Sequence, residues 1–218
     1  MQELLRLPRA HGLFSLMAGG GVLLFAFAVA VVMAEPAQLI GERPPAMTCL
    51  QIAFTPERIT QIILSFPAGI RGAIADLLVP GDMVLAWGYG FLLAGLTGLL
   101  AMRLPGKWFR VGAIVMWAPL AASTLDCIED LFLRTAILRL VADPTAEIPL
   151  LVPLIAGVAA TLKYLGISIV APAFGFAGVI KGLSCDRSIG AIIVYALVVI
   201  VMVSFMLQPL QQIPPCFR

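Results

Sequence analysis

The chain is poor in the residues that soluble enzymes most often use for chemistry. It has one histidine, four cysteines and only 12% charged residues in a length of 218. The cysteines are far apart in the sequence, which excludes the usual zinc and haem spacings. The net charge of +2 is small and scattered, so nothing indicates a nucleic-acid partner. Apolar residues are abundant instead: 61% are hydrophobic and the mean hydropathy is +1.04, as is typical of integral membrane proteins.

Five apolar runs are long enough to cross a bilayer as helices, which takes about 20 residues. Val32-Met33-Ala34 could also be a signal-peptidase site, but the first run has the length of a full span, which favours an uncleaved helix. We therefore predict an all-α integral membrane protein, a five-span helical bundle whose surroundings are the lipid bilayer. The predicted spans are residues 13–34, 82–102, 108–140, 149–180 and 188–207.

Residues 35–81 differ from the rest, since they contain prolines, mixed charges and short amphipathic pieces. Thr55-Pro56-Glu57 is typical of a helix start, with a capping hydroxyl, a proline and an acid in the first turn. Apolar residues at helical spacing follow as far as Pro67, and a second short helix is expected at about residues 70–78. Neither piece can span, so we expect interfacial helices that cap the bundle; a simple packed loop is the alternative.

Basic residues predict the orientation. Arg103, Lys107 and Arg110 form the densest basic cluster, and cytoplasmic loops are the ones enriched in such residues. Residues 1–12 and this loop are therefore expected inside a bacterial inner (plasma) membrane, with residues 35–81 and the tail 208–218 outside. Cys49 and Cys216 would then share an oxidising compartment and could form a disulfide.

The third predicted span contains the chain's main concentration of charge. Five polar residues fall on one helical stripe because positions three and four apart share a face. In the fourth span, Lys163 is as far from the turn at Asp143-Pro144 as Asp126 is, so the two should lie at the same depth. Asp82 and Tyr89 share a face of the second span. The stripe consists of Ser123, Asp126, Glu129, Asp130 and Arg134.

Several roles are open for these groups. In a structural role, Asp126 or Glu129 pairs with Lys163, Asp130 pairs with Arg134, Glu129 faces the outer interface, and the pairs fix helix register. Carboxylates and a lysine inside a membrane are also the usual components of proton or ion pathways. A metal-dependent membrane enzyme is a third reading, since carboxylates can hold Mg²⁺ or Ca²⁺. We favour a non-enzymatic structural or accessory protein that associates with other membrane subunits or with itself.

The chain also resembles a group of uncharacterised bacterial polytopic membrane proteins. Members of that group have a TPER-like loop helix, an Asp that opens the second span, an Asp-x-x-Glu-Asn motif and a Lys followed by an aromatic residue. This chain has Asp130 where Asn is usual and adds a fifth span. The resemblance implies no activity, but it implies one constellation of Asp82, Asp126, Glu129 and Lys163. It rests on Phe54-Thr55-Pro56-Glu57-Arg58, Asp82, Tyr89, Leu125-Asp126-Cys127-Ile128-Glu129-Asp130 and Leu162-Lys163-Tyr164.

Overall fold

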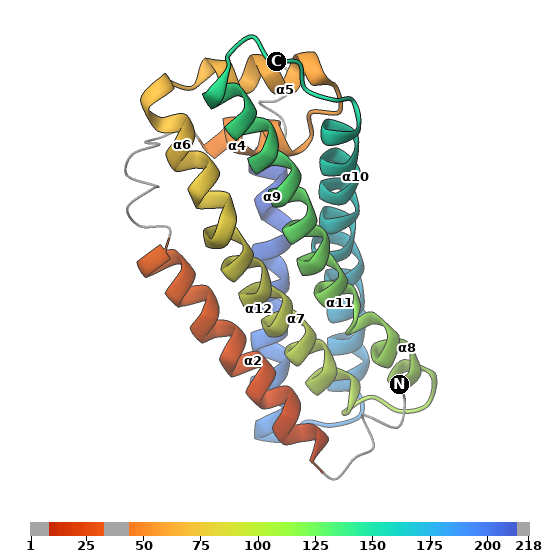
Figure 1. The fold of residues 1–218 in the computed structure, drawn as a ribbon. Coiled ribbons are helices and arrows are strands. Elements are labelled where there is room, and N and C mark those ends of the chain that lie inside the picture. The colour runs from red at the N-terminus through yellow and green to blue at the C-terminus, as the bar shows by residue number, and fades with distance from the viewer. Residues whose placement is uncertain (1–8, 33–43, 213–218) are drawn as a thin grey trace.

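The computed structural model describes residues 9–32 and 44–212, and this part of the chain is helical with no strand (Figure 1). Five of its helical segments are long and apolar enough to cross a membrane, which confirms the predicted all-α membrane bundle. Figure 1 shows them side by side and running alternately up and down. The five are Ala10–Val31, Ala68–Ala101, Lys107–Ala142, Leu151–Leu183 and Ile189–Leu207.

These segments are built from helices that run into one another. The first is α2 (Ala10–Phe27) with the π-helical turn η1 (Ala28–Val32), and the last is α12 (Ile189–Gln212). The other three long segments each contain a π-helical turn or a second helix. They are α6 (Ala68–Asp76), η2 (Leu77–Asp82) and α7 (Met83–Ala101); α8 (Lys107–Val115) and α9 (Ala118–Ala142); and α10 (Leu151–Leu165), η3 (Gly166–Val170) and α11 (Ala171–Leu183).

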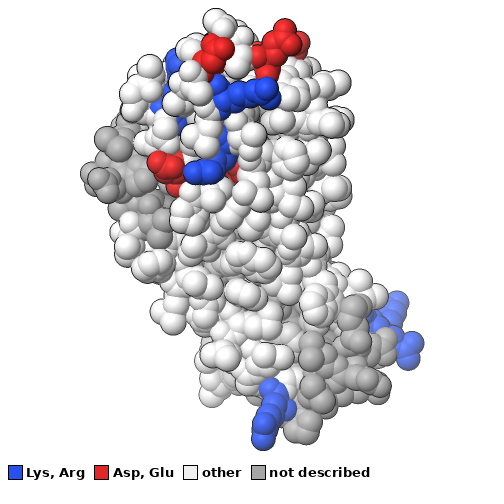
Figure 2. Space-filling view, in the orientation of Figure 1, with Lys and Arg blue, Asp and Glu red and all other residues white. Residues whose placement is uncertain are grey.

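The surface between the two ends of the bundle is apolar. Figure 2 shows one face, on which Asp and Glu lie toward one end, Lys and Arg lie toward both ends, and a broad uncharged band lies between them. A 34-residue helical segment is about 50 Å long, against a hydrocarbon core of about 30 Å, so the long segments reach beyond the core. Such a band is what a bilayer requires of the residues that it contacts.

Two short helices cover one end of the bundle, as predicted for residues 35–81. They are α4 (Pro44–Gln51) and α5 (Pro56–Ser65), which contact α9 and α10 and lie across their ends in Figure 1. Thr55 caps α5 by accepting a hydrogen bond from the Arg58 backbone N–H at 3.3 Å. Ile59 and Ile63 are buried in the cluster that also holds Leu140 of α9. The cap is therefore an apolar layer packed on the bundle.

The second short helix is not a separate element, and here the prediction was wrong. α6 continues through η2 into α7, so the apolar segment begins at Ala68 rather than at Asp82. Pro80 lies inside the segment and Val79 has a non-helical backbone (φ −133°, ψ 113°), so the helix is interrupted without ending. Ile74, Leu77 and Leu78 bury their side chains against the cluster that contains α9, which keeps the chain on the bundle across the interruption.

Close helix packing occurs where glycines allow it. An added Cβ at Gly95 of α7 would lie 2.5 Å from the Ala18 N and 2.7 Å from the Phe14 O of α2. Gly21 of α2 likewise meets the backbone of α7, whereas Gly19 has nothing within 4 Å. In the run Gly19-Gly20-Gly21, Gly21 alone therefore makes the close approach to α7.

At the opposite end from the cap, an ion pair joins the turn between α7 and α8 to the loop before α12. The Arg103 guanidinium donates to the Asp186 carboxylate at 2.9 Å, and the Ser188 backbone N–H donates to its other oxygen, also at 2.9 Å. These hydrogen bonds, those from Ser188 foremost, hold the pKa of Asp186 below its ordinary value of 3.8.

The predicted disulfide stays a prediction. Cys49 is disulfide-bonded, but Cys216 lies outside the described residues. Cys127 and Cys185 are free thiols.

Candidate functional site

The polar stripe of α9 lies inside the bundle between two apolar clusters. Ala122 belongs to the cluster formed with α2, α7 and α12, and Leu133 belongs to the one formed with the cap. The stripe residues between them are closed off from the surface: Asp126 is 3% exposed, and Glu129 and Asp130 are 0% exposed. Ionised groups are costly in such surroundings unless they are paired or neutralised.

Lys163 of α10 joins the stripe at the expected depth. Its Nζ lies 2.5 Å from Asp126 Oδ1, with which it forms a hydrogen bond, and 2.7 Å from Glu129 Oε2. The Glu129 contact is an ion pair by distance but lacks hydrogen-bond geometry. Both acids that were candidates for the pair therefore share one lysine, which is itself 4% exposed.

Helix α7 supplies the other partner of Asp126. The Tyr89 hydroxyl donates to Asp126 Oδ2 at 2.7 Å, so both oxygens of this carboxylate accept a hydrogen bond. Ser123 lies one turn before it on α9 and donates to the Ala86 carbonyl of α7 at 2.7 Å. Gly90 makes room for this contact, because an added Cβ there would collide with Ser123. Asp126 thus ties α7, α9 and α10 together.

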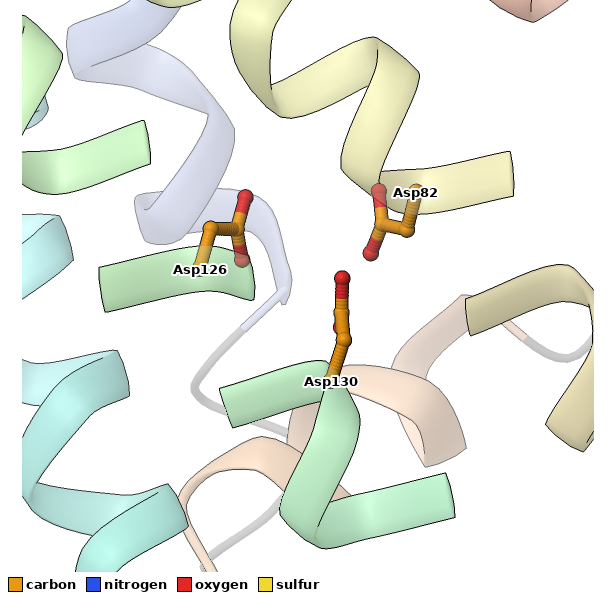
Figure 3. Close-up of side chains that lie close together, drawn as sticks. All are labelled: Asp82, Asp126 and Asp130. Carbon is orange, nitrogen blue, oxygen red and sulfur yellow. The ribbon is translucent and has the colours of Figure 1, made fainter. Parts of the chain in front are cut away.

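Asp126 also lies close to two further aspartates, Asp82 and Asp130. Asp82, Asp126 and Asp130 each offer a carboxylate oxygen, and these three oxygens lie within 4.8 Å of one another. Figure 3 shows Asp82 and Asp130 reaching toward each other from η2 and α9, with Asp126 beside them. Asp82 is half-buried, whereas the other two are buried. Helix α9 and the interrupted segment before α7 therefore bring together residues that are 44 or more positions apart.

Asp130 does not pair with Arg134, contrary to the structural reading. Neither oxygen of Asp130 has a hydrogen-bond partner in the part of the chain that the structure describes. Arg134 instead points outward, with its Nη2 at 3.8 Å from Asp76 Oδ1 and its side chain 37% exposed. A long guanidinium can reach more polar surroundings in this way, whereas the short Asp130 side chain stays inside. Glu129 does not face the outer interface either, since it is 0% exposed and contacts Lys163.

The site has more acids than bases. Asp82, Asp126, Glu129 and Asp130 would carry four negative charges if ionised, and Lys163 carries one positive charge. A formal charge of −3 in a region of low dielectric is strongly unfavourable. The excess is therefore expected to be neutralised by protons or by a bound cation.

A helix interruption and a π-helical turn border the site. Asp82 is the last residue of η2, which is interrupted at Val79, and the π-helical turn η3 begins three residues after Lys163. A π-helical turn widens a helix by one residue and is frequent at functional sites. Both contact α9, which carries the acids between them.

Sequence reasoning missed the way in which α10 is tied to the cap. The Tyr164 hydroxyl donates to Gln51 Oε1 of α4 at 2.7 Å, directly after the lysine of the site. The amphipathic pattern predicts a cap, but it contains no signal that pairs Gln51 with a residue 113 positions away. This bond anchors the Lys163 end of α10 from outside the cluster.

Comparison with protein families, with curated proteins and with solved structures finds no match to this chain. The chain is a multi-pass membrane bundle with a buried, acid-rich site. Its molecular function is inferred from that site.

Proposed function

We propose that the protein carries a cation, a proton or a metal ion, across the membrane and that the acids of α9 and η2 bind it during passage. The observation that supports this is Asp130, a fully buried carboxylate with no donor to either oxygen. Buried polar groups are normally hydrogen-bonded, and an exception calls for a ligand or a functional reason. A site that binds and releases a cation needs such oxygens.

A purely structural role explains only half of the cluster. The contacts of Lys163 with Asp126 and Glu129, and of Tyr89 with Asp126, link three helices and can fix their register. Fixing register requires no third and fourth carboxylate, and Asp130 adds cost without a pairing energy. The structural reading therefore describes the framework that positions the site.

The setting of this function is a bacterial inner membrane. The basic residues near α8 favour a cytoplasmic position for that end and an outer position for the cap of α4 and α5. Five spans are few for a secondary transporter, so we expect self-association or association with another membrane subunit. The predicted similarity to polytopic bacterial proteins agrees with this setting.

Flux measurements on proteoliposomes test the proposal. The protein is reconstituted with an internal pH dye and, in a second preparation, an internal divalent-cation dye, and an inward gradient and a K⁺/valinomycin potential are applied. We expect cation entry above that of protein-free liposomes and its loss in Asp130→Asn.

Asp76→Asn is the matched control because Asp76 is an aspartate of the helical segment that also carries Asp82, but its side chain is 74% exposed. Its flux should equal that of the wild type. Flux no greater than in empty liposomes would leave the structural or accessory role as the better reading. Equal flux in Asp130→Asn and the wild type would mean that Asp130 does not bind the transported cation.

A further inference from the structure

We infer that Asp82, Asp126 and Asp130 bind one hard divalent cation of the Mg²⁺, Mn²⁺ and Ca²⁺ class. This names the cation of the proposed function and rests on that function for its role as cargo. Each residue offers one carboxylate oxygen, and Figure 3 shows the three side chains converging from η2 and α9. Carboxylate oxygens are the ligands that these cations prefer over soft metals.

The separations of the oxygens suit such an ion. Two ligands on opposite sides of a cation are at most twice the metal–oxygen distance apart, about 4.6–5.2 Å for Ca²⁺ and about 4.0–4.2 Å for Mg²⁺. The three oxygens lie within 4.8 Å of one another, which is within the span that two opposite ligands of a Ca²⁺-sized ion can have.

Asp130 is independent evidence for a ligand. It is 0% exposed, and both of its oxygens lack a partner among the described residues. Its carboxylate points at Asp82 in Figure 3, although two carboxylates without a bridging proton or cation repel each other. A divalent cation between them would satisfy the free oxygens and remove the repulsion.

The charge and the bonding capacity of the site allow a divalent ion. The four acids and Lys163 sum to −3 when ionised, and an ion of +2 reduces this to −1, which one shared proton neutralises. Asp126 accepts two hydrogen bonds, from Lys163 and Tyr89, whereas a carboxylate has about four acceptor positions. Asp126 can therefore hold the lysine on one side and the ion on the other.

Asp82 is where the ion would enter. It is the half-buried ligand of the three, and it directly follows the interruption of the helix at Val79 and Pro80. Unwound turns within membrane helices are common places for ion ligands, because they lie where backbone and side chains face a cavity. Asp130 is then the inner ligand.

Calorimetry on the full chain tests the inference. The protein is purified in detergent, stripped with EDTA and titrated with CaCl₂ and MgCl₂ at constant KCl concentration. We expect one divalent ion per chain. Loss of a residue that only hydrogen-bonds to a metal ligand usually weakens binding by roughly 10–100-fold. In Asp130→Asn, which removes a ligand itself, the Kd should rise by more than this. Asp76→Asn should bind the ion as the wild type does.

Asp82→Asn is the second variant, because Asp82 is less buried than Asp130 and its replacement is the safer change if Asp130→Asn does not fold. It should weaken binding in the same direction. The inference is overturned if the wild type binds no divalent ion up to millimolar concentration, or if the variants that fold bind as tightly as Asp76→Asn.

The flux assay separates this inference from the proposed function. Proton flux through a wild type that binds no divalent ion would overturn the metal site and support the proposed transport. One bound divalent ion in a protein that conducts neither protons nor divalent ions would support the site and overturn the transport.

Discussion

Replacement of Lys163 by methionine should destabilise the bundle more than replacement of either acid that it contacts. Lys163 is the cation for both Asp126 and Glu129, at 2.5 and 2.7 Å, and all three groups are buried. Removing one partner of a buried ion pair typically costs about 3–5 kcal/mol, because the remaining charge is left uncompensated. Asp126→Asn leaves Lys163 paired with Glu129, so its cost should be smaller, about 1–3 kcal/mol.

The double variant determines whether the pair is the cause. In a background that already lacks Lys163, Asp126→Asn removes an unpaired acid, so we expect a favourable coupling of about 1–3 kcal/mol. The measurement is the free energy of unfolding in mixed micelles at increasing SDS. Lys107→Met, at an exposed lysine, should change it by less than about 0.5 kcal/mol.

Two results would refute this reasoning. One is a Lys163→Met variant as stable as Lys107→Met, which would mean that the buried acids do not depend on the lysine. The other is strict additivity in the double variant. If Lys163→Met cannot be purified alone, a higher yield of the folded double variant provides the same test.

Further predictions concern packing and pH. Gly95→Ala should destabilise the protein by about 1–3 kcal/mol because its Cβ would meet backbone atoms of α2, whereas Gly19→Ala, in open space, should be neutral or stabilising by up to about 1 kcal/mol. Both are measured by the same SDS unfolding, and equal effects would argue against the close approach of α2 and α7. Asp186 has a pKa lowered by hydrogen bonds in the folded state, so its stabilising effect is complete above its unfolded value near 3.8 and is lost as the pH falls below it. The difference in melting temperature between wild type and Asp186→Asn should therefore shrink from pH 6 to pH 3, and a constant difference would contradict this assignment.

The features that sequence could predict depend on local patterns. Hydropathy and length are properties of single segments, and they predicted the five spans. The helix start at Thr55 depends on three adjacent residues and lies where the motif indicates. Asp126 and Lys163 lie at the same depth because two antiparallel helices with the same rise per residue are joined by a short turn. Predicting this requires no knowledge of other contacts.

The features that sequence did not predict depend on choices between distant partners. The sequence predicted a separate short helix at about residues 70–78, but burial of Leu77 and Leu78 holds the chain on the bundle through the interruption at Val79 and Pro80. Arg134 has Asp130 one turn away on its own helix, yet it turns to Asp76 on α6. Helical spacing limits which groups can meet, but the surrounding elements decide which of them do.

These two outcomes divide the cluster into halves with opposite expectations for stability. On one side, Lys163 and Tyr89 satisfy Asp126; on the other, Asp130 has no donor. In EDTA, Asp130→Asn should therefore leave the free energy of unfolding unchanged or raise it by up to about 1–3 kcal/mol, because it removes an uncompensated buried carboxylate. The free energy of unfolding, measured by SDS in EDTA, should therefore change in opposite directions in Asp130→Asn and Lys163→Met. If Asp130→Asn lowers the free energy of unfolding as much as Lys163→Met does, Asp130 supports the fold as a paired group. A cation would then no longer be needed to explain why an acid lies there.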